Sequence, residues 1–261
     1  MGVRAPRSSH LSQLALVTGV GRQQGIGRAI CQAIATQGVD IFFTYWSRYD
    51  HLMPWSVDDS EPEQIQRELV ELGVRCERLE IDLSRSQAIS TLFDHVMETL
   101  GVPSILINHA TYSLAGTLDE IDAPQLDAHY GVNVRATTLL CAEFARYFRG
   151  RQGRIINLTS GQFQRPMPTE VAYAITKGAI DALTCAIAPT LASRGITVNA
   201  VNPGPTDTGW MTATLRESLR QRFPAGRVGL PEDAAQLVAF LSREVANWIT
   251  GQVLHSEGGF Y

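Results

Sequence analysis

The sequence predicts an α/β fold, in which helices cover both faces of a doubly wound parallel sheet of about seven strands. Short apolar runs rich in β-branched residues alternate with stretches of helical period along the whole chain. A glycine-rich segment also lies between the first apolar run and the first helical stretch. No repeat, low-complexity tract or linker divides the 261 residues, so we expect a single domain over residues 1–261.

The apolar runs and helical stretches place the expected elements. The strands are expected at Leu14–Thr18, Ile41–Tyr45, Arg75–Ile81, Ile105–Asn108, Arg154–Thr159, Ile196–Val201 and Val253–His255. The helices are expected at Gly25–Gln37, Glu63–Leu72, Gln87–Leu100, Leu126–Phe148, Tyr173–Ser193 and Pro231–Leu241. In the second of these helices apolar side chains recur at helical spacing, and Gly73 follows as a C-terminal cap.

Two segments interrupt this rhythm. Trp46–Pro62 is typical of a long loop, and so is Pro203–Pro224, whose middle can form a short helix at Met211–Arg222. Ligands of open α/β sheets bind beyond the carboxyl ends of the strands, where the second segment begins. We therefore expect residues 203–224 to form a lid over a substrate. Residues 1–12 are expected to be flexible.

Composition limits the class of protein. The chain is 44% hydrophobic with a net charge of −4, which allows a full core and shows no electrostatic footprint for nucleic acid. The N-terminal stretch lacks the apolar core of a signal peptide, and no continuous run of about 18 apolar residues indicates a membrane span. The cysteines are widely spaced, which favours reduced thiols over disulfides or a zinc site; they are Cys31, Cys76, Cys141 and Cys185. We expect a cytoplasmic protein without a metal, membrane or nucleic-acid partner.

The glycine-rich segment has the placement of a phosphate-binding turn. Gly19, Gly25 and Gly27 follow a strand and open a helix. Glycines at such positions permit a tight turn and let the backbone approach a pyrophosphate at the helix N-terminus. The segment therefore predicts a dinucleotide site.

The residues after the second strand bear on which dinucleotide binds. NAD sites usually place an acid there, about 20 residues beyond the glycine turn. Here the strand ends at Tyr45, and Asp50 is expected to lie too far along the chain. Arg22 in the turn, and less favourably Arg48, could instead meet a 2′-phosphate. These residues favour NADP(H) over NAD(H).

Tyr173 and Lys177 stand one helical turn apart, and Ser160 precedes them at a strand end. The i, i+4 spacing places the phenol and the ammonium on one helix face. The positive charge is expected to favour the phenolate and so to lower the pKa of Tyr173. A phenol tuned in this way can exchange a proton with a carbonyl or an alcohol. Taken alone, the pair is also compatible with an ordinary surface contact.

Further short motifs follow one another along the chain. They are Ile81-Asp82-Leu83, Asn108-His109-Ala110, Asn133, the segment from Asn202-Pro203-Gly204 through Thr206 to Thr208, and the closing Gly258-Gly259. With the glycine turn, Ser160, Tyr173 and Lys177, they make the chain resemble the short-chain dehydrogenase/reductase family along nearly its whole length, in particular its 3-oxoacyl-[acyl-carrier-protein] reductases. The resemblance implies a Rossmann-type fold.

The resemblance also implies roles. The expected activity is NAD(P)(H)-dependent hydride transfer between nicotinamide and a ketone or secondary alcohol, such as a 3-oxoacyl thioester. Tyr173 would be the general acid, Lys177 would lower its pKa and hold a ribose, Ser160 would hydrogen-bond the carbonyl oxygen, and Asn133 would bind a relay water. The expected cofactor contacts are Gly19, Arg22, Gly25, Ile26, Gly27, Tyr45, Asp82, Leu83, Asn108, Ala110, Tyr173, Lys177, Pro203, Gly204, Thr206 and Thr208.

Several side chains are expected to shape the substrate end. Trp210, Met211 and Phe223 could line an apolar pocket under the lid, and Gln162, Phe163 and Gln164 should lie at its mouth. Family members are commonly homotetramers, which is the expectation for this chain. A basic cluster could dock an acidic acyl carrier protein, although a solvated helix end explains it equally well; its members are Arg146, Arg149, Arg151 and Arg154.

The chain departs from the family pattern at three places. The glycine turn is two residues longer than usual, His109 and Thr111 replace an asparagine and a glycine, and Ser256-Glu257 replaces a common Val-Asp. The enlarged turn suggests an enoyl-thioester reductase as an alternative. Those relatives typically separate the tyrosine and lysine by six residues, whereas three separate them here. A non-catalytic, nucleotide-binding regulator is the other alternative.

Overall fold

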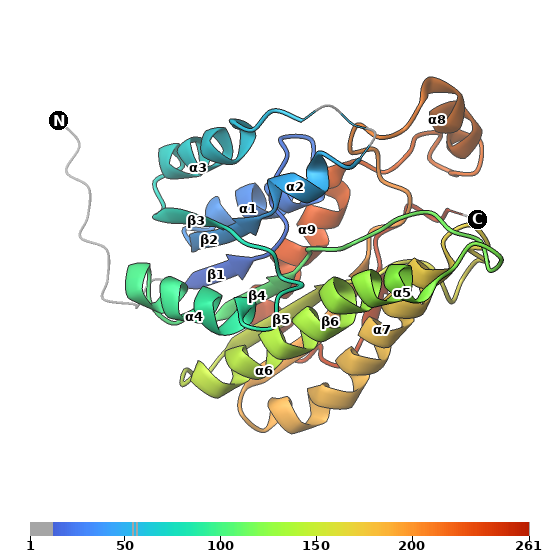
Figure 1. Cartoon of the computed structure of the whole chain (residues 1–261). Helices are drawn as coiled ribbons and strands as arrows, with labels where there is room; N and C mark the ends of the chain where they lie inside the picture. The colour runs from blue at the N-terminus through green and yellow to red at the C-terminus, as the bar shows by residue number, and fades with distance from the viewer. Residues whose placement is uncertain (1–12, 54, 56, 261) are drawn as a thin grey trace.

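The computed structural model describes residues 13–53, 55 and 57–260, and in this part of the chain seven parallel strands form one sheet in the order β3-β2-β1-β4-β5-β6-β7 (Figure 1). The strands are β1 (Leu14–Val17), β2 (Asp40–Tyr45), β3 (Cys76–Glu80), β4 (Ile105–Asn108), β5 (Gly153–Leu158), β6 (Ile196–Asn202) and β7 (Val253–His255). The predicted doubly wound parallel sheet is confirmed. The expected flexibility of residues 1–12 concerns a segment outside the described residues.

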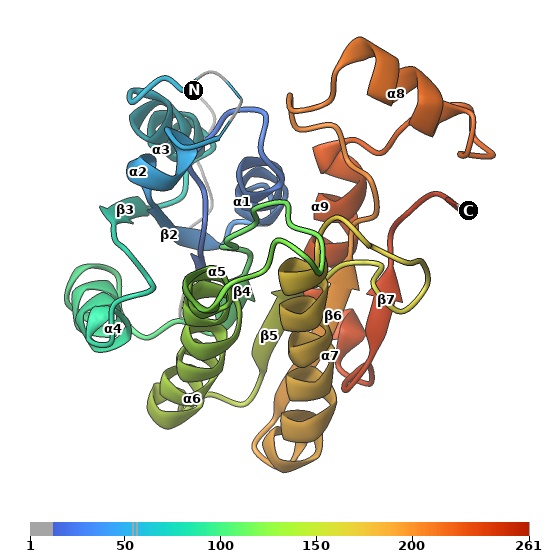
Figure 2. The ribbon, with the colours of Figure 1, turned by 45° about the vertical axis from the view of Figure 1, so that its right-hand side comes forward.

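Alternate residues of the strands feed two separate hydrophobic cores. In β1, Ala15 and Val17 face one core while Leu14 and Leu16 face the other. This alternation follows from the two-residue period of a strand and explains why both faces of the sheet need helices. Figure 2 shows helices on each side of the sheet. The first core holds α1 (Ile26–Ala35), α3 (Glu61–Glu71) and α9 (Pro231–Leu241), and the second holds α4 (Ala88–Thr99), α6 (Thr137–Tyr147) and α7 (Val171–Ala192).

The helix expected over Leu126–Phe148 is divided into three consecutive segments. It begins as α5 (Ala123–His129), widens into the π-helix η1 (Tyr130–Ala136) and continues as α6. Asp122 caps α5 by accepting a hydrogen bond from the Gln125 amide at 2.8 Å. A π-helical turn is rare and often marks a functional site, and here it contains Asn133.

The segment expected to be a long loop after β2 contains a one-turn helix, α2 (Ser47–Asp50), and α3 begins at Glu61, two residues before the predicted start. Pro62 lies in the first turn of α3, where its missing amide hydrogen costs no helical hydrogen bond. The short helix expected over Met211–Arg222 is present as α8 (Ala213–Arg220), capped by Thr212. The short η2 (Glu244–Ala246) follows α9.

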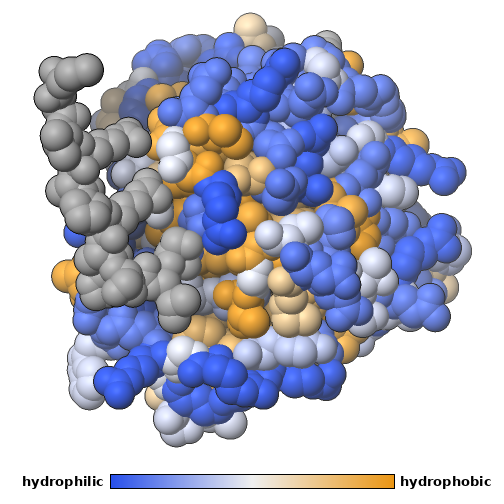
Figure 3. Space-filling view, turned by 90° about the vertical axis from the view of Figure 1, so that its left-hand side faces the viewer, coloured by the Kyte–Doolittle hydropathy of each residue, from blue (hydrophilic) through white to orange (hydrophobic). Residues whose placement is uncertain are grey.

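Figure 3 shows the face that lies on the left in Figure 1, where apolar side chains gather near the middle with polar and charged side chains around them. Val70 in α3 and Leu72, which caps this helix, are 50% and 43% exposed. α7 is, by length and composition, apolar enough to cross a membrane, with a mean hydropathy of 1.4 over its best window, although it is not one continuous apolar run. It carries the buried charged residues Lys177 and Asp181 and packs along β6, as expected of a core helix.

Candidate active site

A cleft of about 1170 Å³ opens where the strands end, and most of the predicted site residues line it. Successive walls of the cleft follow successive strands, as expected for an open α/β sheet. The predicted residues on its surface are Gly19, Arg22, Gly25, Ile26, Gly27, Tyr45, Asp82, Leu83, Ala110, Ser160, Tyr173, Pro203, Gly204, Thr206 and Thr208. Asn108, Asn133 and Lys177 lie behind this surface.

The glycine turn is packed too closely for side chains. A Cβ on Gly19, whose φ is +79°, would lie 2.6 Å from the Ala110 Cα, and one on Gly27 would lie 2.9 Å from the Gly19 carbonyl oxygen. α1 begins after Gly25 without a side-chain cap and without an acid in its first turn. Its first amides are therefore available to an anion, and the cradle fits the pyrophosphate of a dinucleotide.

The two extra residues of the glycine turn place Arg22 between two loops. Its guanidinium donates to the Thr208 carbonyl and hydroxyl oxygens at 3.1 and 3.2 Å, and it lies 4.0 Å from the centre of the Trp55 ring. Arg22 Nε is also 3.8 Å from Asp50 Oδ1. The glycine turn is thus connected to the segments after β2 and β6.

Asp50 lies close to the glycine turn, contrary to the sequence expectation. A Cβ on Gly21 would be 2.5 Å from Asp50 Oδ2. The one-turn helix α2 brings the carboxylate back toward the cleft, which residue spacing alone did not indicate. Burial raises the pKa of Asp50, and the Arg22 guanidinium opposes that shift. This end of the cleft therefore holds the Asp50 carboxylate and the Arg22 guanidinium side by side.

Ser160 and Tyr173 both line the cleft, and the Ser160 side chain opposes part of the rise in the pKa of Tyr173. The Lys177 ammonium lies 5.5 Å from the Tyr173 ring centre and donates to the Leu158 carbonyl oxygen at 2.8 Å. Burial, followed by the negative charge of Glu170, raises the pKa of Tyr173, so the expected lowering is wrong for this structure. A phenol in this environment stays protonated at neutral pH and is suited to donate a proton.

Lys177 is buried in the wall beneath the cleft. Burial lowers its pKa to about 8, while the charge of Asp181, one helical turn further on, opposes this shift. Asp181 accepts a hydrogen bond from Gln162, whose side chain therefore points away from the substrate mouth at which it was expected.

We expect this lysine to give a measurable pH dependence of stability. Its pKa is about 8 in the folded chain against 10.5 for an unperturbed lysine, so the unfolded chain binds more protons between these values. The free energy of unfolding of the wild type, minus that of Lys177→Met, should therefore rise from pH 8 to pH 10.5 and level off outside this window. Urea unfolding of both chains at a series of pH values checks this. A pH-independent difference would show that Lys177 titrates normally.

The two predicted asparagines, Asn108 and Asn133, are buried behind the surface of the cleft. Asn133 accepts from the Tyr112 amide at 2.7 Å and from the Thr111 hydroxyl at 3.0 Å, and it donates to the Tyr112 carbonyl and the Thr176 hydroxyl, both at 2.9 Å. All four hydrogen-bonding positions of its amide are used, so the side chain has none left for the expected relay water. Asn108 is buried and donates to Asn157 at 2.8 Å, not toward the cofactor.

His109 lies beneath the glycine turn as a neutral structural residue. Its Nδ1 is 3.1 Å from the Thr18 carbonyl oxygen, and the Thr18 hydroxyl accepts hydrogen bonds from the amides of His109 and Ala110. Burial lowers the pKa of His109 to about 4. At neutral pH the imidazole therefore carries no charge.

The substrate end of the cleft differs from the sequence expectation. Met211 and Phe223 do not line it; they pack beneath α8 with Phe260 in a small separate core. Phe163 is exposed on the surface, and Gln164 is the acceptor for a hydrogen bond from Asn202. Lining residues that sequence reasoning missed are Tyr49, Asp50, Tyr112, Arg165, Glu170, Glu257 and Phe260. The Ser256-Glu257 departure was the one available signal among them.

The basic cluster lies at the opposite end of the sheet from the cleft. Arg154 is 2% exposed and is the second residue of β5, whereas the cleft opens at the other end of that strand. Arg146 pairs with Glu143 at 2.7 Å on the surface of α6. A carrier docked there would be separated from Tyr173 by the length of the sheet, about 20 Å for a six-residue strand. These contacts do not test the docking expectation for these arginines, which stays a prediction.

The fold, the glycine cradle and the Ser160–Tyr173 pair together define a dinucleotide-binding oxidoreductase. A family model described as "Enoyl-(Acyl carrier protein) reductase" matches residues 19–261. The "Uncharacterized oxidoreductase YjdA" of Bacillus subtilis is 50% identical over 251 residues, covering 95% of this chain and 96% of the relative. A "3-oxoacyl-[acyl-carrier-protein] reductase FabG" of Staphylococcus epidermidis is 30% identical, covering 96% of this chain and all of the relative.

Solved structures agree with these relatives. A short-chain dehydrogenase/reductase from Serratia marcescens is 31% identical with a TM-score of 0.86, and the match covers 96% of this chain and 98% of that one. The angucycline C-6 ketoreductase LanV with bound NADP is 30% identical with a TM-score of 0.84, over 97% of both chains. The chain belongs to the short-chain dehydrogenase/reductase family. It is therefore an oxidoreductase, and the alternative of a non-catalytic regulator is set aside.

Proposed function

We propose that the protein is an NADP(H)-dependent reductase of a ketone, such as a 3-oxoacyl thioester or a similar carbonyl compound. The observation that carries this proposal is the phenol of Tyr173, which shares the wall of the cleft with Ser160 and whose pKa burial raises. A proton donor of this kind suits reduction better than oxidation, because oxidation needs a base at the same place.

The residues of the chain would divide the work of the reaction. Bound nicotinamide would supply the hydride for the carbonyl carbon. Ser160 would hydrogen-bond the carbonyl oxygen, on which negative charge develops, and Tyr173 would transfer its proton there so that the new O–H bond forms. Lys177, whose Nζ lies 5.5 Å from the ring centre, would offer its positive charge to the phenolate that this step leaves behind. We assign the nicotinamide side of the cleft to Pro203, Gly204 and Thr206.

We propose Arg22 as the group that favours NADP(H). Its guanidinium lies in the cleft beside the glycine turn, where a 2′-phosphate could replace the Asp50 carboxylate as its partner. Arg22→Gln should raise KM for NADPH about 10-fold and leave KM for NADH nearly unchanged, because a charge-assisted contact of this kind contributes roughly 1.5–3 kcal/mol. Initial rates with both cofactors measure this. Equal losses for NADPH and NADH would contradict the assignment.

The lid and the assembly belong to the same proposal. Residues 203–224 would close over the substrate, since Trp210, Leu215 and Leu219 from this segment line the cleft.

Trp248, which is 99% exposed in the isolated chain, and Val245 support the expected homotetramer, because apolar groups beside β7 would be covered by a second copy.

The proposal is tested by comparing two thioester substrates. Acetoacetyl and crotonyl thioesters are offered with NADPH or NADH, and the loss of nicotinamide absorbance is followed. We expect turnover of the acetoacetyl thioester or of simple ketones, fastest with NADPH. Turnover of the crotonyl thioester alone would favour the enoyl reductase that the description of the family model names.

A further inference from the structure

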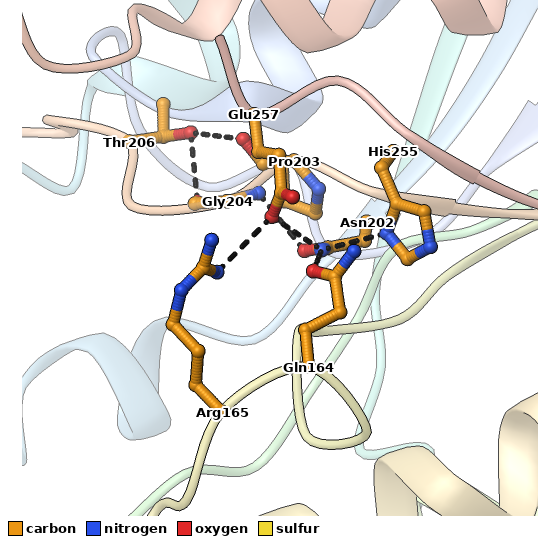
Figure 4. A network of polar contacts seen from close by, with 8 residues as sticks. All are labelled: Gln164, Arg165, Asn202, Pro203, Gly204, Thr206, His255 and Glu257. Carbon is orange, nitrogen blue, oxygen red and sulfur yellow. Dashed lines mark hydrogen bonds and ion pairs between the residues drawn. The ribbon is translucent and has the colours of Figure 1, made fainter. Parts of the chain in front are cut away.

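An ion pair that the proposed mechanism does not use bridges the substrate end of the cleft (Figure 4). Arg165 Nη1 lies 3.3 Å from Glu257 Oε2. Arg165 belongs to the loop that begins with Ser160, and Glu257 to the segment after β7. The two side chains are 22% and 11% exposed, so water and salt screen the pair less than an ordinary surface pair.

Glu257 supports the turn at Pro203–Gly204. Its Oε2 accepts a hydrogen bond from Asn202 Nδ2 at 3.1 Å, and Asn202 Oδ1 accepts one from the Gly204 amide at 2.9 Å. Gly204 has a φ of +63°, and a Cβ there would lie 2.5 Å from the Glu257 Cβ. The backbone of this turn therefore rests directly on Glu257, as Figure 4 shows.

Arg165 is held against the turn that follows Ser160. Its Nη1 lies 3.7 Å from the position of a Cβ on Gly161, and its backbone amide donates to the Gly161 carbonyl oxygen at 3.1 Å. The guanidinium also lies 4.2 Å from the centre of the Phe260 ring. Arg165 thus contacts the serine loop on one side and the C-terminal segment on the other.

We propose that Arg165 and Glu257 are a positioning pair, which sets the distance between the proton-donor wall at Ser160 and the wall at Pro203–Gly204. The inference rests on the proposed function, because that function assigns the proton to the first wall and the hydride to the second. The reaction forms a C–H bond beside one wall and an O–H bond beside the other, so the two walls must be correctly spaced. A displacement of about 1 Å can lower the rate about 100-fold. The pair also decides which face of a prochiral ketone meets the hydride.

A purely structural pair would behave differently. It would lower the melting temperature when broken, yet the folded fraction would keep its kcat and its product stereochemistry. A positioning pair changes both of these while cofactor affinity stays close to that of the wild type. The enantiomeric ratio of the alcohol is decisive, because it does not depend on how much of the enzyme is folded.

Three variants break the pair, two conservative variants keep its charges, and one variant is the control. Arg165→Met removes the charge and keeps an apolar contact for Phe260, and Glu257→Gln keeps an acceptor for Asn202. The third is the double variant. The matched control is Arg146→Met, which removes an exposed arginine from its ion pair with Glu143 at the far end of the sheet.

We expect each single substitution to lower kcat about 10- to 100-fold and to lower the enantiomeric ratio, with NADPH Kd changed by no more than about threefold. The double variant should be no worse than the poorer single variant, because both remove the same interaction. Arg165→Lys and Glu257→Asp should recover part of the activity. The control should match the wild type.

The inference is overturned if the single variants keep the wild-type kcat and enantiomeric ratio, or if their losses multiply in the double variant. Its failure can be told apart from failure of the proposed function. If the wild type reduces a carbonyl and Tyr173→Phe does not, while the pair variants are unaffected, only the pair is misassigned. If the wild type reduces no carbonyl, the proposed function itself fails.

Discussion

Tyr173→Phe should abolish nearly all turnover and leave the fold and cofactor binding intact. The substitution removes only the phenolic hydroxyl, which is the proposed proton donor and lies in the cleft wall with Ser160. General acid catalysis contributes about 100- to 10,000-fold, so kcat/KM should fall by that factor. Steady-state reduction of the best ketone measures the loss, and NADPH fluorescence titration measures binding.

The matched control is Tyr130→Phe, because Tyr130 is 52% exposed and lies outside the cleft. It should reduce ketones as fast as the wild type. If Tyr173→Phe kept activity within about threefold of the wild type, another group would be the acid, and the proposed mechanism would fail.

Gly19→Ala should have the largest effect on the nucleotide half of the cleft. Gly19 has a φ of +79°, and a Cβ there would lie 2.6 Å from the backbone of Ala110. An alanine would therefore meet both left-handed strain, about 1–2 kcal/mol, and a clash with backbone that cannot move aside. We expect a clear loss of stability and at least about a 10-fold weaker NADPH affinity, the equivalent of roughly 1.4 kcal/mol.

Gly38→Ala separates these two causes. Gly38 has nearly the same φ, +81°, but a Cβ there would meet nothing within 4 Å. It should share the strain and show neither the clash nor the loss of affinity. Urea unfolding and NADPH titration of both variants check this. Equal losses in the two variants would mean that close packing of the glycine turn against Ala110 is unimportant.

The repeating parts of the fold could be predicted from the sequence. Continuous apolar runs such as Leu14–Val17 and the glycines before α1 are local signals, and both lead to the observed sheet and cradle. The break of the central helix at Tyr130–Ala136 could not be predicted, because it accompanies long-range contacts of Asn133 with Tyr112 and Thr176.

The pKa shifts and the placement of charges in the site depend on the three-dimensional fold as well as on residue spacing. Spacing placed Lys177 beside Tyr173, but burial of the phenol decides the direction of the pKa shift. Asp50 and Glu257 reach the cleft because α2 folds back and because the C-terminal segment passes under Gly204. Neither approach is encoded in residue spacing, so the sequence motifs located the walls of the cleft but not all of the side chains between them.

The most direct test of the proposed function follows the hydride itself. NADPH carrying deuterium at its transferable C4 position is used to reduce an acetoacetyl thioester, and the product is analysed by NMR. The proposal predicts a hydroxyl-bearing product with deuterium on the former carbonyl carbon. Recovery of the acetoacetyl thioester without deuterium, while a crotonyl thioester in a parallel reaction gains deuterium at its β-carbon and becomes saturated, would contradict it.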